Sequence, residues 1–169
     1  AQELQRLGIP FQDGIAITGL RATLDGGHPG PTVGVMGELD SLIVLGHPHA
    51  DPNTSAAHAC GHHCQIGALL AVARGLHASG VMKDLSGRVA LLAVPAEEYI
   101  EIEYRDELRR AGELEFLGGK AEFIRLGALD DVDLAMMTHT DRVPPSGGKI
   151  GIGSSNNGML AKRIRFTGR

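Results

Sequence analysis

The chain has few aromatic residues and no long apolar run, and each scarcity excludes a class of function. Tryptophan is absent and aromatic residues make up 4% of the 169 residues, so no platform for stacking nucleic-acid bases is visible. No apolar segment reaches the roughly 18 residues that a membrane-spanning helix needs. The formal net charge is −4, and the short basic run Lys162-Arg163-Ile164-Arg165 is too small to reverse it. We therefore expect neither a nucleic-acid nor a membrane partner.

Cysteine is also scarce, with two residues, Cys60 and Cys64. Two cysteines four positions apart do not make a disulfide framework, and no signal peptide is recognised at the start of the chain. A reducing, cytoplasmic setting is the simplest expectation. The length is enough for one domain with a real core, and the 24 glycines indicate many tight turns.

Apolar patterns along the chain predict strands that alternate with helices. Three continuous apolar runs are typical of buried strands, and they lie at 32–39, 88–94 and 133–138. Further strands are expected at 15–20, 21–24, 149–152 and 159–167. Helices are expected within 1–10, 63–79, 99–115 and 120–126. Such an alternation is the signature of an α/β sheet with helices on its faces.

Polar side chains follow the end of each predicted buried strand. The first strand ends at Glu38-Leu39-Asp40, the second at Glu97-Glu98 and the third at Thr138-His139-Thr140, while Cys60-Gly61-His62 directly precedes a helix. In α/β sheets, chemistry gathers just beyond the carboxyl ends of the strands. We therefore expect these four polar clusters to meet at one edge of one sheet.

Cys60 and His62 combine a thiolate with an imidazole, a ligand pair that suits zinc or a similar divalent ion. Backbone N–H groups at the helix start are expected to stabilise the Cys60 thiolate and lower its pKa. A small buried cysteine beside a loop histidine is the structural alternative. A four-ligand zinc site that also used His63 and Cys64 is sterically poor, because neighbouring side chains diverge once the helix begins.

Glu97 and Glu98 are adjacent acids that follow a buried strand and a proline, where a simple solvated pair is not expected. Two anions this close repel, so one of them must be neutralised. If Glu98 binds a metal ion, Glu97 is left beside a water molecule activated by that metal and can serve as its general base.

His139 and Asp40 have two interpretations each. His139 at the end of the third strand is either a further metal ligand or a satisfied loop residue. Asp40 either orients a ligating histidine, a common need around metal sites, or serves as a helix N-cap or turn residue.

Several short motifs resemble one family over nearly the whole chain. The sequence resembles the aminoacylase/carboxypeptidase-type metallo-amidohydrolases, in the branch of hippurate, indole-acetyl-amino-acid and p-aminobenzoyl-glutamate hydrolases. The motifs that carry this resemblance are Gly37-Glu38-Leu39-Asp40-Ser41-Leu42, Ala57-His58-Ala59-Cys60-Gly61-His62, Pro95-Ala96-Glu97-Glu98, Gly118-Gly119-Lys120-Ala121 and Met137-Thr138-His139-Thr140.

The resemblance implies a fold, a site and a reaction. The fold would be a three-layer, zinc-peptidase-like α/β domain with a mostly parallel mixed sheet. Cys60 would bridge two Zn or Mn ions, His62, Glu98 and His139 would be further ligands, and Glu97 would be the catalytic base. The reaction would be hydrolysis of the amide bond of N-acyl amino acids or related peptide-like amides.

Three features depart from that family. His63 stands where the family commonly has an aspartate, and the segment from Tyr99 to Leu117 is longer and more charged. The chain is also less than half the family's length. We therefore expect 1–161 to be a partial catalytic domain, incomplete at both ends and weakly active or inactive alone. Residues 162–169 would begin an inserted lid that makes a homodimer, and the family's last ligand would lie beyond Arg169.

Two other functions remain open at this point. A dipeptidase or carboxypeptidase-type metallopeptidase would use the same ligands, so only its substrates would differ. A non-catalytic α/β binding module would keep the fold but hold no metal ion.

Overall fold

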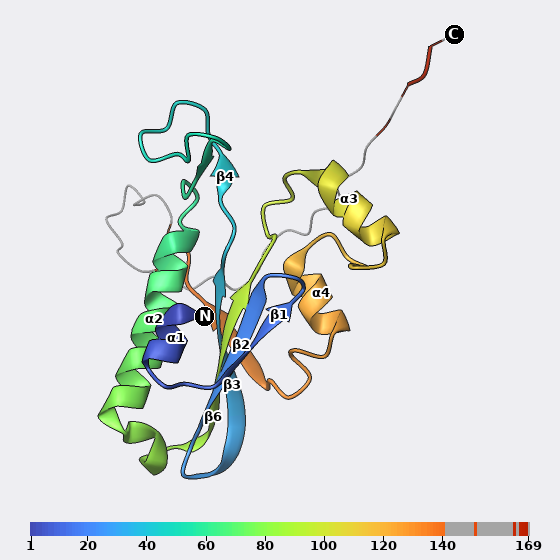
Figure 1. The fold of residues 1–169 in the computed structure, drawn as a ribbon. Helices are drawn as coiled ribbons and strands as arrows, with labels where there is room; N and C mark the ends of the chain where they lie inside the picture. The colour runs from blue at the N-terminus through green and yellow to red at the C-terminus, as the bar shows by residue number, and fades with distance from the viewer. Residues whose placement is uncertain (141–150, 152–163, 165, 169) are drawn as a thin grey trace.

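A five-stranded mixed sheet with helices on both faces organises the chain (Figure 1). The computed structural model describes residues 1–140, 151, 164 and 166–168. Within them the strands stand in the order β1-β2-β6-β3-β7. Their bounds are Phe11–Ile15 for β1, Gly19–Asp25 for β2, His28–Glu38 for β3, Ser86–Val94 for β6 and Leu134–Met137 for β7.

The helices flank this sheet in two layers. On one side lie α1 and the long α2, and on the other lies α4, with α3 beyond the end of β6 (Figure 1). A small hairpin of β4 (Leu42–Ile43) and β5 (Ala56–Ala57) stands apart from the sheet. The helices are α1 Gln2–Arg6, α2 His62–Ser79, the 3₁₀ turn η1 Val81–Asp84, α3 Ile102–Arg110 and α4 Gly119–Arg125.

Strand β6 at the centre of the sheet explains the three layers. Leu91 and Ala93 face the cluster that packs against α2, whereas Leu92 and Val94 face the cluster that includes Phe123 of α4. Successive side chains on a strand point to opposite faces, so an unbroken apolar run needs cover on both sides. The predicted α/β fold with layered helices is thereby confirmed.

The sheet is mixed, as predicted, but its parallel and antiparallel strand pairs are equal in number among the described strands. β3 pairs in parallel with β6 and with β7, whereas β1 with β2 and β2 with β6 are antiparallel. The parallel half carries the three strand ends that precede the polar motifs. Parallel neighbours bring their carboxyl ends to one edge, so this half positions the site.

Two predicted strands need correction. The strand expected at 15–20 is instead the reversal between β1 and β2, with Ala16 and Ile17 at positive φ. Its apolar β-branched residues gave a strand pattern, but the tight turn overrides that propensity. The run at 133–138 does form β7, yet its residues are exposed rather than buried, because β7 is the outermost strand of the described sheet.

Of the other predicted elements, some are confirmed and some fall on residues that the structure does not describe. The helix expected at 63–79 and the one expected at 120–126 match α2 and α4 closely, and α3 lies within 99–115. The strand expected at 159–167 and the domain boundary expected at 161/162 fall largely outside the described residues, as does most of the strand expected at 149–152. In the described part of the chain, no helix combines the length and the apolarity needed to span a membrane.

Candidate metal centre

The carboxyl edge of the parallel strands gathers the polar motifs. Glu38 is the last residue of β3, Glu97 and Glu98 follow β6, and His139 follows β7. His62 is the first residue of α2, whose start faces the same edge. Residues far apart in the sequence are therefore brought together by the sheet alone.

Two glycines make close packing around the start of α2 possible. Gly61 precedes the helix at φ +113°, a conformation that L side chains rarely adopt, and a Cβ there would lie 2.1 Å from Thr140 Oγ1. A Cβ on Gly37 would lie 3.1 Å from Ile66 Cδ1 in the first turns of α2. Glycine at position 37 lets the end of β3 lie close to the first turns of α2, and glycine at position 61 leaves room for Thr140 beside the helix start.

His62 lies at the middle of the site and is buried, with 1% of its surface exposed. Its Nδ1 is 3.0 Å from the backbone carbonyl of Asp40. Because a carbonyl only accepts hydrogen bonds, this contact assigns a proton to Nδ1, so the neutral imidazole, the form that binds a metal, keeps its lone pair on Nε2. That lone pair faces carboxylate oxygens of Glu38 at 2.9 Å, Glu98 at 3.6 Å and Glu97 at 3.8 Å.

These buried acceptors lack a donor. His62 Nε2, Glu98 Oε1 and Asp40 Oδ1 are buried and make no hydrogen bond to any residue that the structure describes. His62 Nε2 and Glu98 Oε1 lie 3.6 Å apart, and two buried acceptors that face each other are costly unless a cation lies between them. Imidazole nitrogen and carboxylate oxygen are ligands for zinc and related divalent ions. The residues present therefore fit a divalent metal ion.

Cys60 and His139 complete the donor set. Cys60 Sγ is 3.8 Å from His139 Nε2, and the rings of His139 and His62 meet edge to face with centroids 6.1 Å apart. One ligand atom from each of Cys60, His62 and His139 lies within 4.8 Å of the others. Atoms of Glu38, His62 and Glu97 form a second such group. His62 thus belongs to two overlapping groups that could hold an ion.

The charge state of Cys60 differs from the expectation. A hydrogen bond with Glu98, followed by burial and by the charges of Glu98, Glu97 and Glu38, raises the pKa of the Cys60 thiol to about 11. The expected lowering by the helix start is therefore wrong for the metal-free protein. Neighbouring carboxylates outweigh the helix N-terminus, because they carry full charges close to the sulfur.

Asp40 connects the histidine to the acid pair. Its Oδ2 accepts a 2.8 Å hydrogen bond from the backbone N–H of Glu98, and its Oδ1 lies 3.4 Å from His62 Nδ1. The alternative of a helix N-cap does not apply, because Asp40 lies between β3 and β4 and precedes no helix. The position supports the orienting role, which stays a proposal.

Glu97 differs from Glu98 in its surroundings. Its side chain is 40% exposed, against 15% for Glu98. Burial and the charge of Glu38 raise the pKa of Glu97, the charge of Lys120 acts against this, and that of Glu98 adds to it. A carboxylate that reaches solvent and binds protons more readily than usual is suited to accept one.

Sequence reasoning assigned no role to three residues of the site. Glu38 and Gln65 are both buried and bonded to each other, and Lys120 of α4 forms an ion pair with Glu38. Glu38 stands two residues before Asp40, so both lie on one face at the end of β3. Gln65 stands one helical turn after His62. Both spacings can be read from the sequence and place these residues beside the predicted ligands. A search for metal ligands alone overlooks them.

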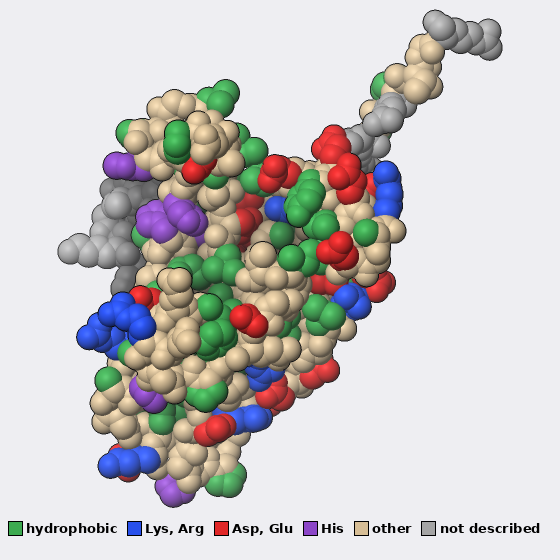
Figure 2. Space-filling model, viewed as in Figure 1, with side chains coloured by type: hydrophobic (Ala, Val, Ile, Leu, Met, Phe, Trp, Pro, Cys, Tyr) green, Lys and Arg blue, Asp and Glu red, His purple; other side chains and the backbone are tan. Residues whose placement is uncertain are grey.

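The remaining polar residues of the motif region face elsewhere. His63 and Cys64 are exposed and belong to neither candidate metal group among the described residues. Figure 2 shows histidine side chains gathered where α2 begins and acidic side chains over α3. His58 and His63 contribute a tilted ring pair with centroids 5.9 Å apart.

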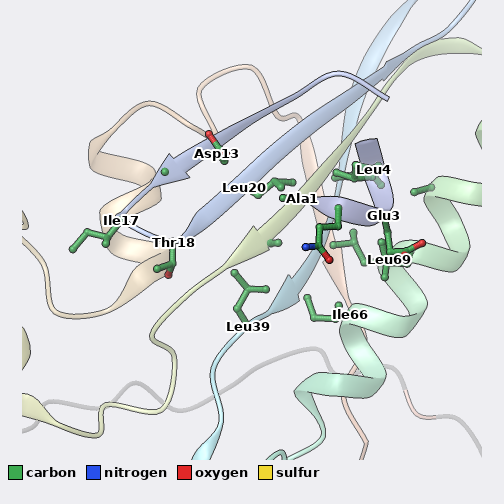
Figure 3. A pocket seen from close by; sticks show the side chains of 16 residues that line it. Ala1, Glu3, Leu4, Asp13, Ile17, Thr18, Leu20, Leu39, Ile66 and Leu69 are labelled. Carbon is green, nitrogen blue, oxygen red and sulfur yellow. The ribbon is translucent and has the colours of Figure 1, made fainter. Parts of the chain in front are cut away.

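A separate apolar cavity of about 670 Å³ lies between α1, α2 and the sheet (Figure 3). Its walls come from Leu4, Leu20, Leu39, Ile66 and Leu69, among others. None of the candidate metal ligands lines it. The cavity and the candidate metal centre are therefore distinct places in the fold.

Sequence relatives of the chain are amidohydrolases. The chain is 34% identical over 162 residues to the IAA-amino acid hydrolase ILR1-like 6 of Arabidopsis thaliana, covering 94% of this chain and 30% of that protein. It is 30% identical over 138 residues to the N-acyl-L-amino acid amidohydrolase of Geobacillus stearothermophilus, covering 80% and 32%. The chain thus spans about a third of the length of these curated relatives. No protein-family model matches it.

A solved structure shares the fold of this chain. A dinuclear metal binding peptidase of the M20 family from Bacillus subtilis superposes with a TM-score of 0.60, covering 79% of this chain and 33% of that structure at 22% identity. The resemblance noted in the sequence is confirmed by these matches. The chain is a relative of the aminoacylase and carboxypeptidase-type amidohydrolases, with the α/β fold of the M20 peptidase catalytic domain and about a third of those proteins' length.

Proposed function

We propose that this chain carries the metal centre of an enzyme that hydrolyses the amide bond of N-acyl amino acids or related peptide-like amides. The single observation that carries the proposal is the buried lone pair of His62 Nε2, which faces three carboxylates and no donor among the described residues. The amide-hydrolase relatives support the reaction class, because their names specify acyl–amino-acid bonds.

In this proposal Cys60, His62, Glu98 and His139 would hold the divalent metal. An ion at this place would polarise the amide carbonyl and lower the pKa of water towards neutrality. The thiolate favours zinc, whereas the carboxylates also accept manganese. Metal analysis of the purified protein, before and after chelation, decides between the two ions.

Glu97 is proposed as the proton carrier. It accepts a proton from the attacking water while the water oxygen bonds to the amide carbon, and it returns that proton to the amine nitrogen as the C–N bond breaks. Its exposed side chain and raised pKa support this role, and its place in the group with Glu38 and His62 would put it beside the ion. The more buried Glu98, held through its backbone by Asp40, is better suited to ligation.

The whole protein is proposed to comprise more than the described residues. Residues 1–161 would form part of the catalytic domain and 162–169 would begin a lid that mediates a homodimer, in a cytoplasmic setting. This part rests on the resemblance and on the share of the relatives that the chain covers. The chain by itself is expected to be weakly active or inactive.

Replacing Glu97 tests the assignment. Glu97→Gln in the full-length protein should retain its metal and lose turnover of an N-acyl amino acid by about 100-fold or more, as expected for a general base. Glu107→Gln, the same change on the exposed face of α3, is the matched control and should keep full activity. Wild-type protein without metal, or a Glu97→Gln variant with normal turnover, would refute the proposal. The non-catalytic alternative predicts the first of these outcomes.

A further inference from the structure

Lys120 pairs with an acid of the candidate metal centre, and the proposed reaction gives it no role. Its ammonium forms an ion pair and hydrogen bond with Glu38 Oε1. The Lys120 side chain is about two-fifths exposed, whereas the Glu38 side chain is 2% exposed. A partly solvated cation therefore reaches in to a fully buried anion.

Glu38 is held from three directions. Its Oε2 accepts a 3.1 Å hydrogen bond from Gln65 Nε2, and its backbone N–H donates a 2.8 Å bond to Gln65 Oε1. The same Oε2 lies 2.9 Å from His62 Nε2. With Oε1 taken by Lys120, the orientation of the carboxylate against the imidazole is fixed. Losing any one of these partners leaves the buried carboxylate free to rotate.

The position of Lys120 is itself set by tight packing. Gly119, the first residue of α4, has no room for a side chain, since a Cβ there would lie 1.7 Å from the carbonyl oxygen of Pro95. Its N–H donates a 3.2 Å hydrogen bond to Ala96 O. The start of α4 is thus pressed against the end of β6, which directs Lys120 to the same edge as Glu97.

Lys120 offsets part of the negative charge around His62. Four carboxylates, those of Glu38, Asp40, Glu97 and Glu98, lie within 4 Å of the His62 ring nitrogens. Among the described residues, no other lysine or arginine forms an ion pair with any of them. Glu38 is the nearest of the four to Nε2, and it is the one that Lys120 engages.

We propose that Lys120 is a positioning residue of the metal centre: it holds the Glu38 carboxylate beside His62 Nε2, at the place where an ion would bind. The inference rests on the proposed function, because it presupposes a metal at His62. Glu38 then presents a carboxylate of fixed orientation to the ion, while Glu97 stays free for substrate. Partners that orient ligating groups typically change metal affinity by about 10–100-fold.

Cobalt titration of the protein tests the proposal directly. Co²⁺ is followed by its ligand-field bands and by the sulfur-to-cobalt charge-transfer band, so that both affinity and Cys60 ligation are observed. Lys120→Met, which keeps the chain length but not the charge, should bind Co²⁺ about 10-fold more weakly. Lys120→Arg should stay within about threefold of wild type, because it keeps the cation. Lys83→Met, the same change at the exposed η1 turn, is the matched control.

A double-mutant cycle separates positioning from general stability. If Lys120 acts through Glu38, the double variant Lys120→Met/Glu38→Gln should bind Co²⁺ no more weakly than Glu38→Gln alone. Additive losses would overturn the proposal, since they would place the lysine in contact with something else. Should Lys120→Met fail to fold, Lys120→Gln keeps a hydrogen-bond donor without the charge and takes its place in the cycle.

The outcomes also distinguish this inference from the function on which it rests. A wild-type protein that takes up no cobalt removes the metal centre and both proposals with it. Wild-type uptake with unchanged affinity in Lys120→Met removes only the role of the lysine. A weakened Lys120→Met that Lys120→Arg rescues, with Lys83→Met unaffected, supports both.

Discussion

The carboxylate of Asp40 accepts a 2.8 Å hydrogen bond from the backbone N–H of Glu98. This bond joins the loop after β3 to the loop after β6. The backbone carbonyl of Asp40 meanwhile contacts His62 Nδ1 at 3.0 Å. One residue thus sets both the tautomer of a proposed ligand and the backbone position of another.

Removing the Asp40 carboxylate should therefore weaken metal binding. We expect Asp40→Ala to lower the affinity for Zn²⁺ by about 10–100-fold, as for other partners that orient ligands. Asp40→Asn keeps an acceptor for the Glu98 N–H and should lose several-fold less. Competition with a chromophoric chelator measures both, and Asp13→Ala on the exposed β1 is the control. Wild-type affinity in Asp40→Ala would show that the carboxylate is dispensable.

Cys60 should be nearly inert towards alkylation in the metal-free protein. Its pKa of about 11 leaves about two orders of magnitude less thiolate near pH 8 than an unperturbed thiol of pKa about 8.5 would have. The exposed Cys64 should be labelled first by iodoacetamide, with each site followed by peptide mass spectrometry. Labelling of Cys60 should rise as the pH is raised towards 11. Equal labelling of both cysteines at pH 8 would contradict the raised pKa.

The sequence predicted secondary structure correctly where one physical requirement dominated. Continuous apolar runs at 32–39 and 88–94 predicted buried parallel strands, because only a strand covered on both faces tolerates them. The run at 133–138 has the same pattern, and it became an exposed edge strand because the pattern does not report sheet order. Sequence spacing likewise cannot show that Lys120 meets Glu38, since that contact depends on how α4 packs.

The proposed ligands were identified from residue chemistry, whereas their charge states were not. The donor set of Cys60, His62, Glu98 and His139 follows from the preferences of a divalent ion. The pKa of Cys60 instead depends on three carboxylates that arrive from other elements. Electrostatic environment is a property of the assembled site, so local sequence predicted its sign wrongly.

Glu122 should make the protein sensitive to acid. Arg125 first, then the backbone N–H groups of Phe116 and Glu115, hold the pKa of this buried carboxylate below its usual 4.5. A lowered folded-state pKa stabilises the protein above about 4.5, and this stabilisation is lost as the pH falls through the folded-state value.

Glu122→Gln should therefore lower the free energy of unfolding by about 1.5–3 kcal/mol near pH 7, the usual range for hydrogen bonds to a charged group. The difference from wild type should shrink as the pH falls through the folded-state pKa of Glu122, which lies below the usual 4.5. Urea unfolding at several pH values measures it, with Glu107→Gln on exposed α3 as the control. A difference that does not depend on pH would mean that the charge of Glu122 has no part in stability.

Gly119→Ala should displace α4 from the end of β6. The added Cβ would lie 1.7 Å from Pro95 O, so backbone must move. We expect a loss of about 1–3 kcal/mol in unfolding free energy. Gly67→Ala is the matched control, because Gly67 lies in α2 with nothing within 4 Å of its added Cβ. That variant should gain about 0.5–1 kcal/mol. A Gly119→Ala protein as stable as wild type would rule out the tight contact.

Arg105 of α3 gives the charged segment after Glu98 a definite architecture. Its Nη1 donates to the carbonyl of Ala96 at 3.4 Å and to that of Leu117 at 3.3 Å. One guanidinium therefore bonds to both ends of this segment. One end is the carbonyl just before Glu97 and Glu98, and the other is the carbonyl just before Gly118 and Gly119, which lead to Lys120. The residues between these two ends, Arg105 excepted, can change in number or in charge while the reacting groups keep their spacing, so this stretch is where such a chain could acquire a new substrate preference without rebuilding its chemistry.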